Sequence, residues 1–289
     1  MHPRFMRGVP FENRGKEIRK IRSNRKIRKK LNKIMLSKNR IKYIRSLALK
    51  KRRTEDHVFV AEGPRLVGEL VPVFTARYIA ATQEWADANS SLLQRLAVQP
   101  EIVTDDELRK VSSLETPQQV LAIFEQPRYE EDARQVISNS LCLALDDVQN
   151  PGNLGTIIRI ADWFGIGDIF CSRNTADVYN PKTVQACMGG LARVRVHYVD
   201  LPDLLATLPD STPVYGTFLH APSIYKTDLS TTGLIIMGNE GNGISDDVAR
   251  YVNRRVTIPN YPEGSLTTES LNVAIATAIV CAEFRRAYK

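Results

Sequence analysis

Short apolar runs that alternate with helical segments through the second half of the chain constrain its fold more than any other feature. Alternation of this kind predicts a parallel sheet covered by helices on both faces, that is, an α/β fold. In such sheets ligands bind beyond the carboxyl ends of the strands. The predicted strands are residues 141–147, 167–171, 193–199, 213–219, 233–238 and 254–259. The predicted helices are 154–164, 181–189, 201–208, 245–252 and 268–287.

A second, smaller α/β unit precedes this region. A helix is predicted from Ser37, which is placed to cap it, because Ile41, Ile44 and Leu47 share one helical face. Further strands are predicted over 57–63, 76–81 and 119–125, and further helices over 64–71 and 84–97. The polar, proline-containing segment 126–140 separates the two units. The predicted division is an extension over 1–34, a small α/β domain over 35–130 and a larger domain over 136–289.

The positive charge of the chain is concentrated at its N-terminus. Residues 1–53 carry 21 Lys and Arg against only Glu12 and Glu17, a net charge of +19, whereas the whole chain carries +8. The remainder is therefore −11. This asymmetry predicts a polyanionic partner such as a nucleic acid. Residues 1–34 are low in complexity and are expected to be disordered in isolation. The alternatives are a solvated tail without function, or a start of the protein at Met35.

The remaining composition predicts a protein of the cytoplasm. No apolar run reaches the roughly 18 residues needed to span a membrane, and no secretory signal is recognisable at the N-terminus. The four cysteines form no C-x-x-C pair and stand in apolar surroundings, which predicts buried free thiols. The four histidines are equally scattered, so no metal site is predicted.

The segment NPGNLGTIIR, residues 150–159, lies where the first predicted strand leads into a helix. Its glycines are spaced G-x-x-G, so it lacks the G-x-G-x-x-G pattern of a dinucleotide-binding turn. Aspartate, asparagine and glycine residues here are expected to form a turn with positive φ and the helix cap. Gly155 is expected to leave space above Arg159, one helical turn later. Taken alone, Arg159 is better explained as an exposed side chain paired with Asp162.

A wholly apolar strand leads directly into the glycine-rich loop 238–243. Three glycines in six residues let the backbone approach a ligand closely, and consecutive amides can hold a carboxylate or a ring edge. Glu240 places a carboxylate inside this loop. The alternative is a tight turn after which Ser245 caps the next helix.

The third unusual segment, residues 257–284, is a loop with two prolines followed by a helix rich in small residues. Thr267 or Thr268 is the expected N-cap of this helix. Ser270 and Asn272 are not needed for capping. Close packing inside the domain or at a dimer seam is predicted from Ala274, Ala276, Ala278 and Ala282.

Together, NPGNLGTIIR, MGNEGNG and IP…ESLNVAIA resemble motifs one, two and three of the SPOUT methyltransferases, specifically the SpoU/TrmH branch of RNA ribose 2′-O-methyltransferases. The resemblance covers residues 141–289, and the stretch beginning KNRIKYIRSLALKKR resembles the substrate-binding domain of that branch. It implies a parallel-sheet domain with a deep trefoil knot, an exception to the near-absence of knots. It also implies S-adenosylmethionine bound in a bent shape by the knotted loops, and a homodimer whose active sites lie near the seam.

The resemblance also assigns site residues position by position. The implied catalytic residues are Asn153 and Arg159 in motif one, Glu240 in motif two, and Ser270 and Asn272 in motif three. The implied cofactor contacts are Thr217, Leu219, Gly238, Asn239, Gly241, Ile258 and Leu271. The loop 260–269 is longer than in many relatives, so no cofactor contact is assigned within it.

The implied reaction transfers a methyl group from S-adenosylmethionine to a ribose 2′-hydroxyl of RNA. By analogy, the separate small domain favours ribosomal RNA over transfer RNA as the substrate. The alternative is a non-catalytic RNA-binding or ribosome-assembly protein that retains the fold. A dinucleotide-dependent enzyme is disfavoured because no G-x-G-x-x-G pattern is present.

Overall fold

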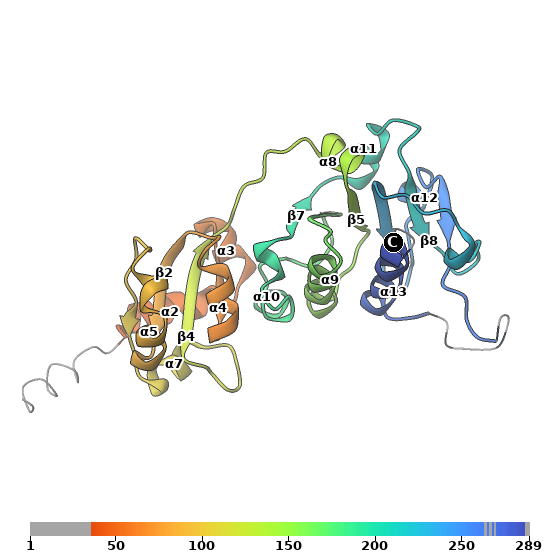
Figure 1. Cartoon of the computed structure of the whole chain (residues 1–289). Coiled ribbons are helices and arrows are strands. Elements are labelled where there is room, and N and C mark those ends of the chain that lie inside the picture. Colours follow the sequence, from red (N-terminus) through yellow and green to blue (C-terminus); the bar gives the residue numbers. More distant parts are fainter. Residues whose placement is uncertain (1–35, 263–264, 266–267, 269, 287–289) are drawn as a thin grey trace, which may run out of the picture.

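The computed structural model describes residues 36–262, 265, 268 and 270–286, so the predicted extension over 1–34 lies outside the described residues. Figure 1 shows two units, each built on its own β-sheet. The first unit contains strands β1 (Val58–Glu62), β2 (Ala76–Ala81), β3 (Glu101–Ile102) and β4 (Val120–Glu125). Its helices are α2 (Lys38–Ser46), α3 (Lys50–Asp56), α4 (Pro64–Leu70), α5 (Gln83–Ala88), α6 (Ser90–Leu93) and α7 (Asp105–Val111).

The small sheet has the strand order β1-β4-β2-β3. β4 pairs antiparallel with β1 and β2, whereas β3 pairs parallel with β2. One face packs on α2 and α7 in a cluster of its own, and the other packs on α4 and joins the core of the second unit. The ring of Phe59 on β1, for example, stacks on that of Tyr179 at 5.0 Å between centroids. The two units are therefore joined by apolar packing.

The predicted helix at Ser37 is confirmed, since the Ser37 hydroxyl accepts from the Arg40 N–H at 3.2 Å. The helix predicted over 84–97 is instead broken into α5 and α6 at Asn89, whose side-chain amide donates to the Trp85 carbonyl at 2.8 Å. Helix α7 was not predicted, although Thr104 and Glu107 form a capping box at its start. That T-x-x-E pattern is a signal from which α7 can be predicted.

The second unit carries all six of the predicted strands. They are β5 (Leu141–Leu145), β6 (Asp168–Cys171), β7 (Arg195–Tyr198), β8 (Val214–Thr217), β9 (Gly233–Met237) and β10 (Arg254–Val256). Its α-helices are α8 (Ala133–Asn139), α9 (Pro151–Trp163), α10 (Pro181–Ala186), α11 (Leu201–Ala206), α12 (Asp246–Ala249) and α13 (Val273–Arg286). Two 3₁₀ turns, η1 (Gly190–Ala192) and η2 (Ile224–Lys226), lie between them.

All strand pairs of this sheet are parallel, as predicted, in the order β10-β8-β9-β5-β6-β7. Alternate residues of β5 point to opposite faces: Leu143 joins the cluster under α9 and α13, and Cys142 joins the cluster under α8, α11 and α12. Helices therefore cover both faces. The chain runs outward from β5 to β6 and β7 and then crosses to β8, so β5 and β9 flank a topological switch point. Ligands of open parallel sheets bind at such a point.

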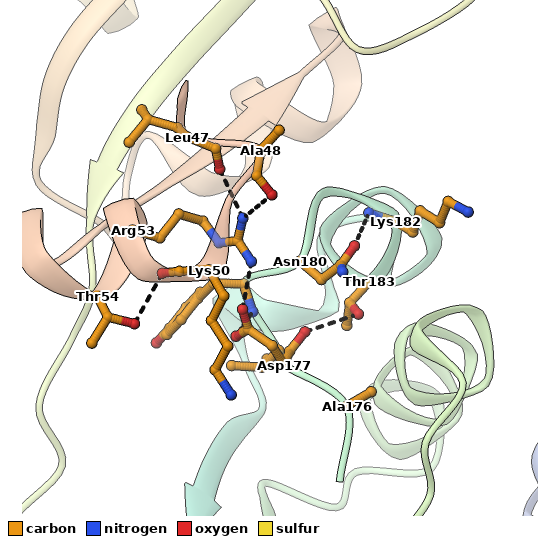
Figure 2. A network of polar contacts seen from close by, with 12 residues as sticks. Leu47, Ala48, Lys50, Arg53, Thr54, Ala176, Asp177, Asn180, Lys182 and Thr183 are labelled. Atoms are coloured by element: carbon orange, nitrogen blue, oxygen red, sulfur yellow. Dashed lines mark hydrogen bonds and ion pairs between the residues drawn. The ribbon is translucent and has the colours of Figure 1, made fainter. Parts of the chain in front are cut away.

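A buried ion pair adds a polar link between the two units. Arg53 of α3, only 2% exposed, donates from Nη2 to Asp177 Oδ2 at 2.6 Å. Its Nη1 donates to the carbonyls of Leu47 and Ala48 at 2.7 Å each, just after α2 (Figure 2). The second carboxylate oxygen of Asp177 accepts from the Tyr179 N–H at 2.9 Å. The pair thus holds α3 against the segment between β6 and α10.

Helix α8 lies inside the segment predicted to contain the domain boundary. Asp132 caps it by accepting from the Arg134 N–H at 3.0 Å, so this polar segment becomes helical at residue 133. The expected start of the second domain at residue 136 falls within the helix, and the boundary itself stays a prediction. The trefoil knot implied by the resemblance also stays a prediction.

All four cysteines are buried free thiols, as the sequence predicts. Burial raises the pKa of Cys142 and of Cys281 to about 12, so both thiols are protonated at neutral pH. Within the part of the chain that the structure describes, no group of His, Cys, Asp and Glu is arranged to hold a metal ion. No helix in the described ranges is long and apolar enough to cross a membrane.

Candidate active site

The three unusual loops meet at the switch point of the large sheet. Asn153 of α9 donates from Nδ2 to Glu240 Oε1 at 2.6 Å, which joins the first loop to the second. Asn272, just before α13, donates from Nδ2 to Asn153 Oδ1 at 3.1 Å, which joins the third loop to the first. Asn153 can serve both neighbours because a side-chain amide offers a donor and an acceptor. Three of the five implied catalytic residues therefore form one hydrogen-bonded chain.

The first loop is built by asparagine, proline and aspartate. Asn150 caps α9, accepting from the N–H groups of Gly152 at 2.8 Å and Asn153 at 3.3 Å, and Pro151 occupies the first helical position. The left-handed backbone of the turn falls on Asp147, with φ of 58°. The expected turn with positive φ is therefore confirmed at Asp147, but the glycines do not form it, because Gly152 already lies inside the helix.

Gly155 also has a different role from the expected one. A Cβ at this position would lie 2.6 Å from the Ala186 Cβ and 2.6 Å from the Thr183 carbonyl oxygen, both on α10. The missing side chain thus lets α10 cross close to α9. The expected space above Arg159 is filled by this neighbouring helix. A substitution that adds a methyl group here requires the two helices to separate.

Arg159 lies exposed on α9 and makes no hydrogen bond or ion pair with another described residue. The alternative pairing with Asp162 is wrong, because the Asp162 carboxylate accepts from Arg193 at 2.7 and 2.9 Å instead. Arg159 is not part of the Asn153 hydrogen-bonded chain, since six positions turn a helix by about 240°. Its guanidinium is consequently available to a ligand or a partner chain.

The glycine-rich loop after β9 closes on itself. Asn239 and Gly243 exchange two backbone hydrogen bonds of 2.9 Å, and Gly243 has a φ of +70°. A Cβ at Gly238 would lie 2.2 Å from the Gly243 carbonyl carbon, so a side chain has no room there. The Asn239 side chain accepts from the Gly241 and Asn242 N–H groups and donates to the Asp147 carbonyl at 2.7 Å. Asn239 thereby fixes both the loop and its distance from the first loop.

Two aspartates directly after β5, Asp146 and Asp147, connect the first loop to segments that follow neighbouring strands. The buried Asp146 carboxylate accepts from the Ser245 N–H and hydroxyl at 2.8 Å each. Ser245 stands at the N-cap position of α12, but its side chain makes no capping hydrogen bond because it is used on Asp146. Asp147 accepts from the Ser172 hydroxyl at 2.5 Å.

Asn272 is the N-cap of α13. Its Oδ1 accepts from the N–H groups of Ala274 at 3.0 Å and Ile275 at 3.3 Å. The N-cap was expected at Thr267 or Thr268. Thr268 is not the cap, because it precedes Asn272 by four positions. Thr267 lies outside the described residues. The helix starts at 273 rather than 268 because the Asn272 amide satisfies its first N–H groups while also reaching Asn153.

The implied cofactor residues gather at the same edge of the sheet. Thr217 ends β8, Ile258 follows β10, and Leu271 precedes α13. Leu219 and Leu271 are 67% and 49% exposed, which is unusual for large apolar side chains. Ser270 is exposed and has no hydrogen-bond partner among the described residues. The remaining implied contacts, Gly238, Asn239 and Gly241, lie in the loop after β9.

Comparison with known proteins identifies both units. The model of the SpoU rRNA Methylase family matches residues 140–282, and the model of the MRM3-like substrate binding domain matches residues 38–122. The 23S rRNA (guanosine(2553)-2′-O)-methyltransferase of Bacillus subtilis (strain 168) is 31% identical over 251 residues, which cover 85% of this chain and 96% of that protein. The chain belongs to the SpoU rRNA methylase family. The resemblance inferred from the three motifs is thereby confirmed.

Solved structures agree with this membership of the SpoU family. A structure from Porphyromonas gingivalis assigned to the TrmH family matches with a TM-score of 0.76 and 40% identity, covering 87% of this chain and 99% of that one. The SpoU methyltransferase AviRb from Streptomyces viridochromogenes, in complex with AdoMet, matches with a TM-score of 0.75 and 26% identity, covering 86% and 98%. AdoMet is S-adenosylmethionine, so the two-unit architecture is shared with a protein that binds the cofactor implied by the resemblance.

The double role of Asn272 can be tested with two substitutions. Asn272→Ala removes the helix cap and should destabilise the chain by about 1 kcal/mol, a drop in Tm of roughly 2–4 °C. Asn272→Asp retains a capping oxygen, because Asp and Asn cap equally well, but it loses the donor to Asn153. Thermal unfolding followed by circular dichroism should therefore separate Ala from Asp. An unchanged Tm for Asn272→Ala would show that Asn272 is not the cap.

Proposed function

We propose that this chain transfers the methyl group of S-adenosylmethionine to a ribose 2′-hydroxyl of ribosomal RNA. The observation that carries the proposal is the hydrogen-bonded chain of Asn153, Glu240 and Asn272, which joins the three motif loops at the switch point in a member of the SpoU family. Supporting it, the Bacillus subtilis relative, similar to nearly the whole chain, is named for 2′-O methylation of a guanosine in 23S rRNA. Ribosomal RNA is preferred to transfer RNA for that reason.

The residues at the crevice fit S-adenosylmethionine, which supplies the methyl group when bound. Leu219, Ile258 and Leu271 offer apolar surface for a purine ring at the ends of β8 and β10 and before α13. The backbone of Gly238 and Gly241 offers polar groups beside it, within a loop whose shape Asn239 fixes. Thr217 offers its backbone and a hydroxyl oxygen that can only accept, because the hydroxyl already donates to the Ile236 carbonyl at 3.3 Å.

Arg159 is proposed to position the attacking ribose oxygen and to neutralise its developing negative charge. A role as general base is energetically demanding, because an arginine pKa of about 12.5–13.8 makes the neutral form cost roughly 7–9 kcal/mol at pH 7. The 2′-hydroxyl proton then leaves late in the reaction, to water or to a neighbouring phosphate. Asn153, Glu240, Ser270 and Asn272 are proposed to shape the pocket and orient the ribose.

RNA capture is proposed to rest on the small domain and its basic helices. Exposed cations on α2 and α3 supply sequence-independent phosphate contacts with a strong salt dependence. These residues are Lys38, Arg40, Lys42, Arg45, Lys50, Lys51 and Arg52. The more basic segment 1–34 is proposed to add to this attraction.

A homodimer is proposed, with the seam along α9 and α13. These helices pack side by side (Figure 1), and Arg285 of α13 donates to the carbonyls of Phe164 and Gly165 just beyond α9. Trp163 on α9 is 85% exposed and Ile275 on α13 is 53% exposed, which leaves apolar surface for a second copy to cover. A cytoplasmic location is proposed together with the ribosomal substrate.

Isothermal titration with S-adenosylmethionine separates the enzyme from its rival, a non-catalytic RNA-binding protein with the same fold. The enzyme should bind the cofactor at one site per chain, and Gly238→Ala should abolish that binding because a Cβ there clashes with Gly243. Arg134→Ala, an exposed substitution on α8, is the matched control. Wild-type protein that binds RNA but takes up no S-adenosylmethionine would support the rival function.

A further inference from the structure

A cavity lies between the small domain and the carboxyl edge of the large sheet, outside the crevice described above. Its volume is about 320 Å³, within the range of small-ligand pockets. The small domain lines it with Lys50 of α3, and the large domain lines it with Arg173, Asp177, Tyr179 and Tyr198. Figure 2 shows Lys50 and Asp177 close to the buried Arg53 that joins the two domains. The cavity is therefore built by the docking of the domains.

This cavity shares an edge of the sheet with the candidate active site. Arg173 follows β6 and Tyr198 ends β7, so both stand at carboxyl ends of strands, as the motif loops do. The two places are also connected. Ser172, next to Arg173, donates to the Asp147 carboxylate, and the Asp147 carbonyl accepts from Asn239 in the glycine-rich loop. The cavity and the crevice are therefore linked by contacts between loops at one edge of the sheet.

The charges around the cavity favour an anion. Asp177 lines it, but its carboxylate is already paired with Arg53 at 2.6 Å. Lys50 and Arg173 are exposed and form no ion pair with any other described side chain. Because the charge of Asp177 is balanced by that of Arg53, the charges of Lys50 and Arg173 make the cavity positive. Two exposed cations on opposite sides of a cleft can hold consecutive phosphates of a nucleic acid.

The aromatic rings add a second kind of contact. Tyr198 is 40% exposed, yet its hydroxyl is fixed, accepting from the Val178 N–H at 2.8 Å and donating to the Ala176 carbonyl. The ring is therefore held in place with part of its surface open to the cavity. Tyr179 lies beside it and is already stacked on Phe59. A pre-positioned ring beside phosphate-binding cations is the arrangement that binds an unpaired base.

We propose that this cavity binds one nucleotide of single-stranded RNA near the nucleotide that is methylated. Lys50 and Arg173 contact its phosphates, and its base stacks on Tyr198. The inference rests on the proposed function, because it names part of the RNA surface of that same enzyme. It assigns the join between the domains a role in holding the substrate, in addition to the basic faces of α2 and α3.

The test is binding of a fluorescein-labelled, unstructured 12-nucleotide RNA to the full chain, followed by fluorescence anisotropy over a range of salt concentrations. The Lys50→Ala/Arg173→Ala double variant should bind about tenfold more weakly, and its salt slope should fall by about 1.4, since two phosphate contacts to a single strand are lost. Arg134→Ala is the control, because it removes an exposed arginine that does not line the cavity and should bind as wild type does.

Substitution of Tyr198 tests the stacking contact separately. Tyr198→Phe and Tyr198→Leu both lose the hydroxyl bonds to the Ala176 and Val178 backbone, so their difference reports on the ring alone. Leu should weaken RNA binding about tenfold relative to Phe. Titration with S-adenosylmethionine should give wild-type affinity in every variant, which shows that the crevice is intact.

The outcomes distinguish this cavity from the proposed function. If the wild type methylates RNA while both sets of variants bind RNA as Arg134→Ala does, the nucleotide site is wrong and the enzyme stands. If the variants lose RNA affinity as expected while the wild type transfers no methyl group, the site stands and the proposed reaction is wrong. A wild-type protein that binds no RNA overturns both.

Discussion

Replacement of Arg159 by alanine should lower kcat for methyl transfer by roughly 10²–10³-fold, the effect typical of removing one group that stabilises an oxyanion. The guanidinium is exposed and has no partner among the described residues, so its loss should leave the fold intact. Affinity for S-adenosylmethionine should also be unchanged, because Arg159 lies outside the hydrogen-bonded chain of Asn153. The measurement is single-turnover transfer of labelled methyl groups to RNA, with titration of the cofactor alongside.

Two further variants sharpen this prediction. Arg159→Lys should lose most of the activity, because an ammonium group cannot make the planar, two-point contact of a guanidinium. Arg250→Ala, which removes an exposed arginine paired with Asp247 on the surface, should remain fully active. Near-full activity of Arg159→Lys would rule out two-point positioning. The pH dependence is measured under conditions in which the chemical step limits the rate. If the wild-type rate constant rises tenfold per pH unit to above pH 10 and that of Arg159→Ala does not, Arg159 is the base.

Replacement of Arg53 by methionine should destabilise the chain by about 3–5 kcal/mol, the usual effect of removing one partner from a buried ion pair. The side chain of Arg53 is 2% exposed and that of Asp177 is 14% exposed, so the substitution leaves a carboxylate nearly buried without its cation. The carbonyls of Leu47 and Ala48 also lose their donor. Urea unfolding of the full chain measures the free energy.

A double variant shows whether the charge itself is responsible. Arg53→Met/Asp177→Leu should recover much of the lost stability, since apolar replacement of a whole buried pair is often nearly neutral. Arg77→Met is the exposed counterpart: it breaks the Arg77–Glu125 pair, in which both side chains are about half exposed, and should cost less than about 1 kcal/mol. An equally small effect of Arg53→Met would mean that apolar packing alone joins the domains.

Local sequence patterns predict the strands and most of the residues that meet at the site. They do not predict how those residues are held in place. Apolar runs predict all six strands of the large sheet because buried parallel strands tolerate few polar residues. The cap of α13 was misassigned because Thr267, Thr268 and Asn272 are all good capping residues, and only the contact with Asn153 favours Asn272. Gly155 was misinterpreted because its neighbour on α10 lies some thirty residues along the chain.

The join between the domains could not be predicted from any local pattern. Arg53 and Asp177 stand 124 positions apart, and each belongs to a segment rich in other polar residues. Their pairing depends on how β1 packs against α10, which no spacing within either segment encodes. The cavity beside this pair was therefore also absent from the sequence-based expectations, although Lys50 belonged to the predicted basic segment.

The most direct measurement is the mapping of ribose 2′-O-methyl groups in ribosomal RNA by resistance to alkaline cleavage. Unmethylated 23S rRNA is incubated with S-adenosylmethionine and either the wild-type chain or Arg159→Ala. The wild type should add a 2′-O-methyl group at one defined nucleotide, and Arg159→Ala should leave that nucleotide open to cleavage. Methylation of a base, or no new resistance anywhere in the RNA from a wild-type chain that binds the cofactor, would contradict the assignment of this protein as a ribose 2′-O-methyltransferase.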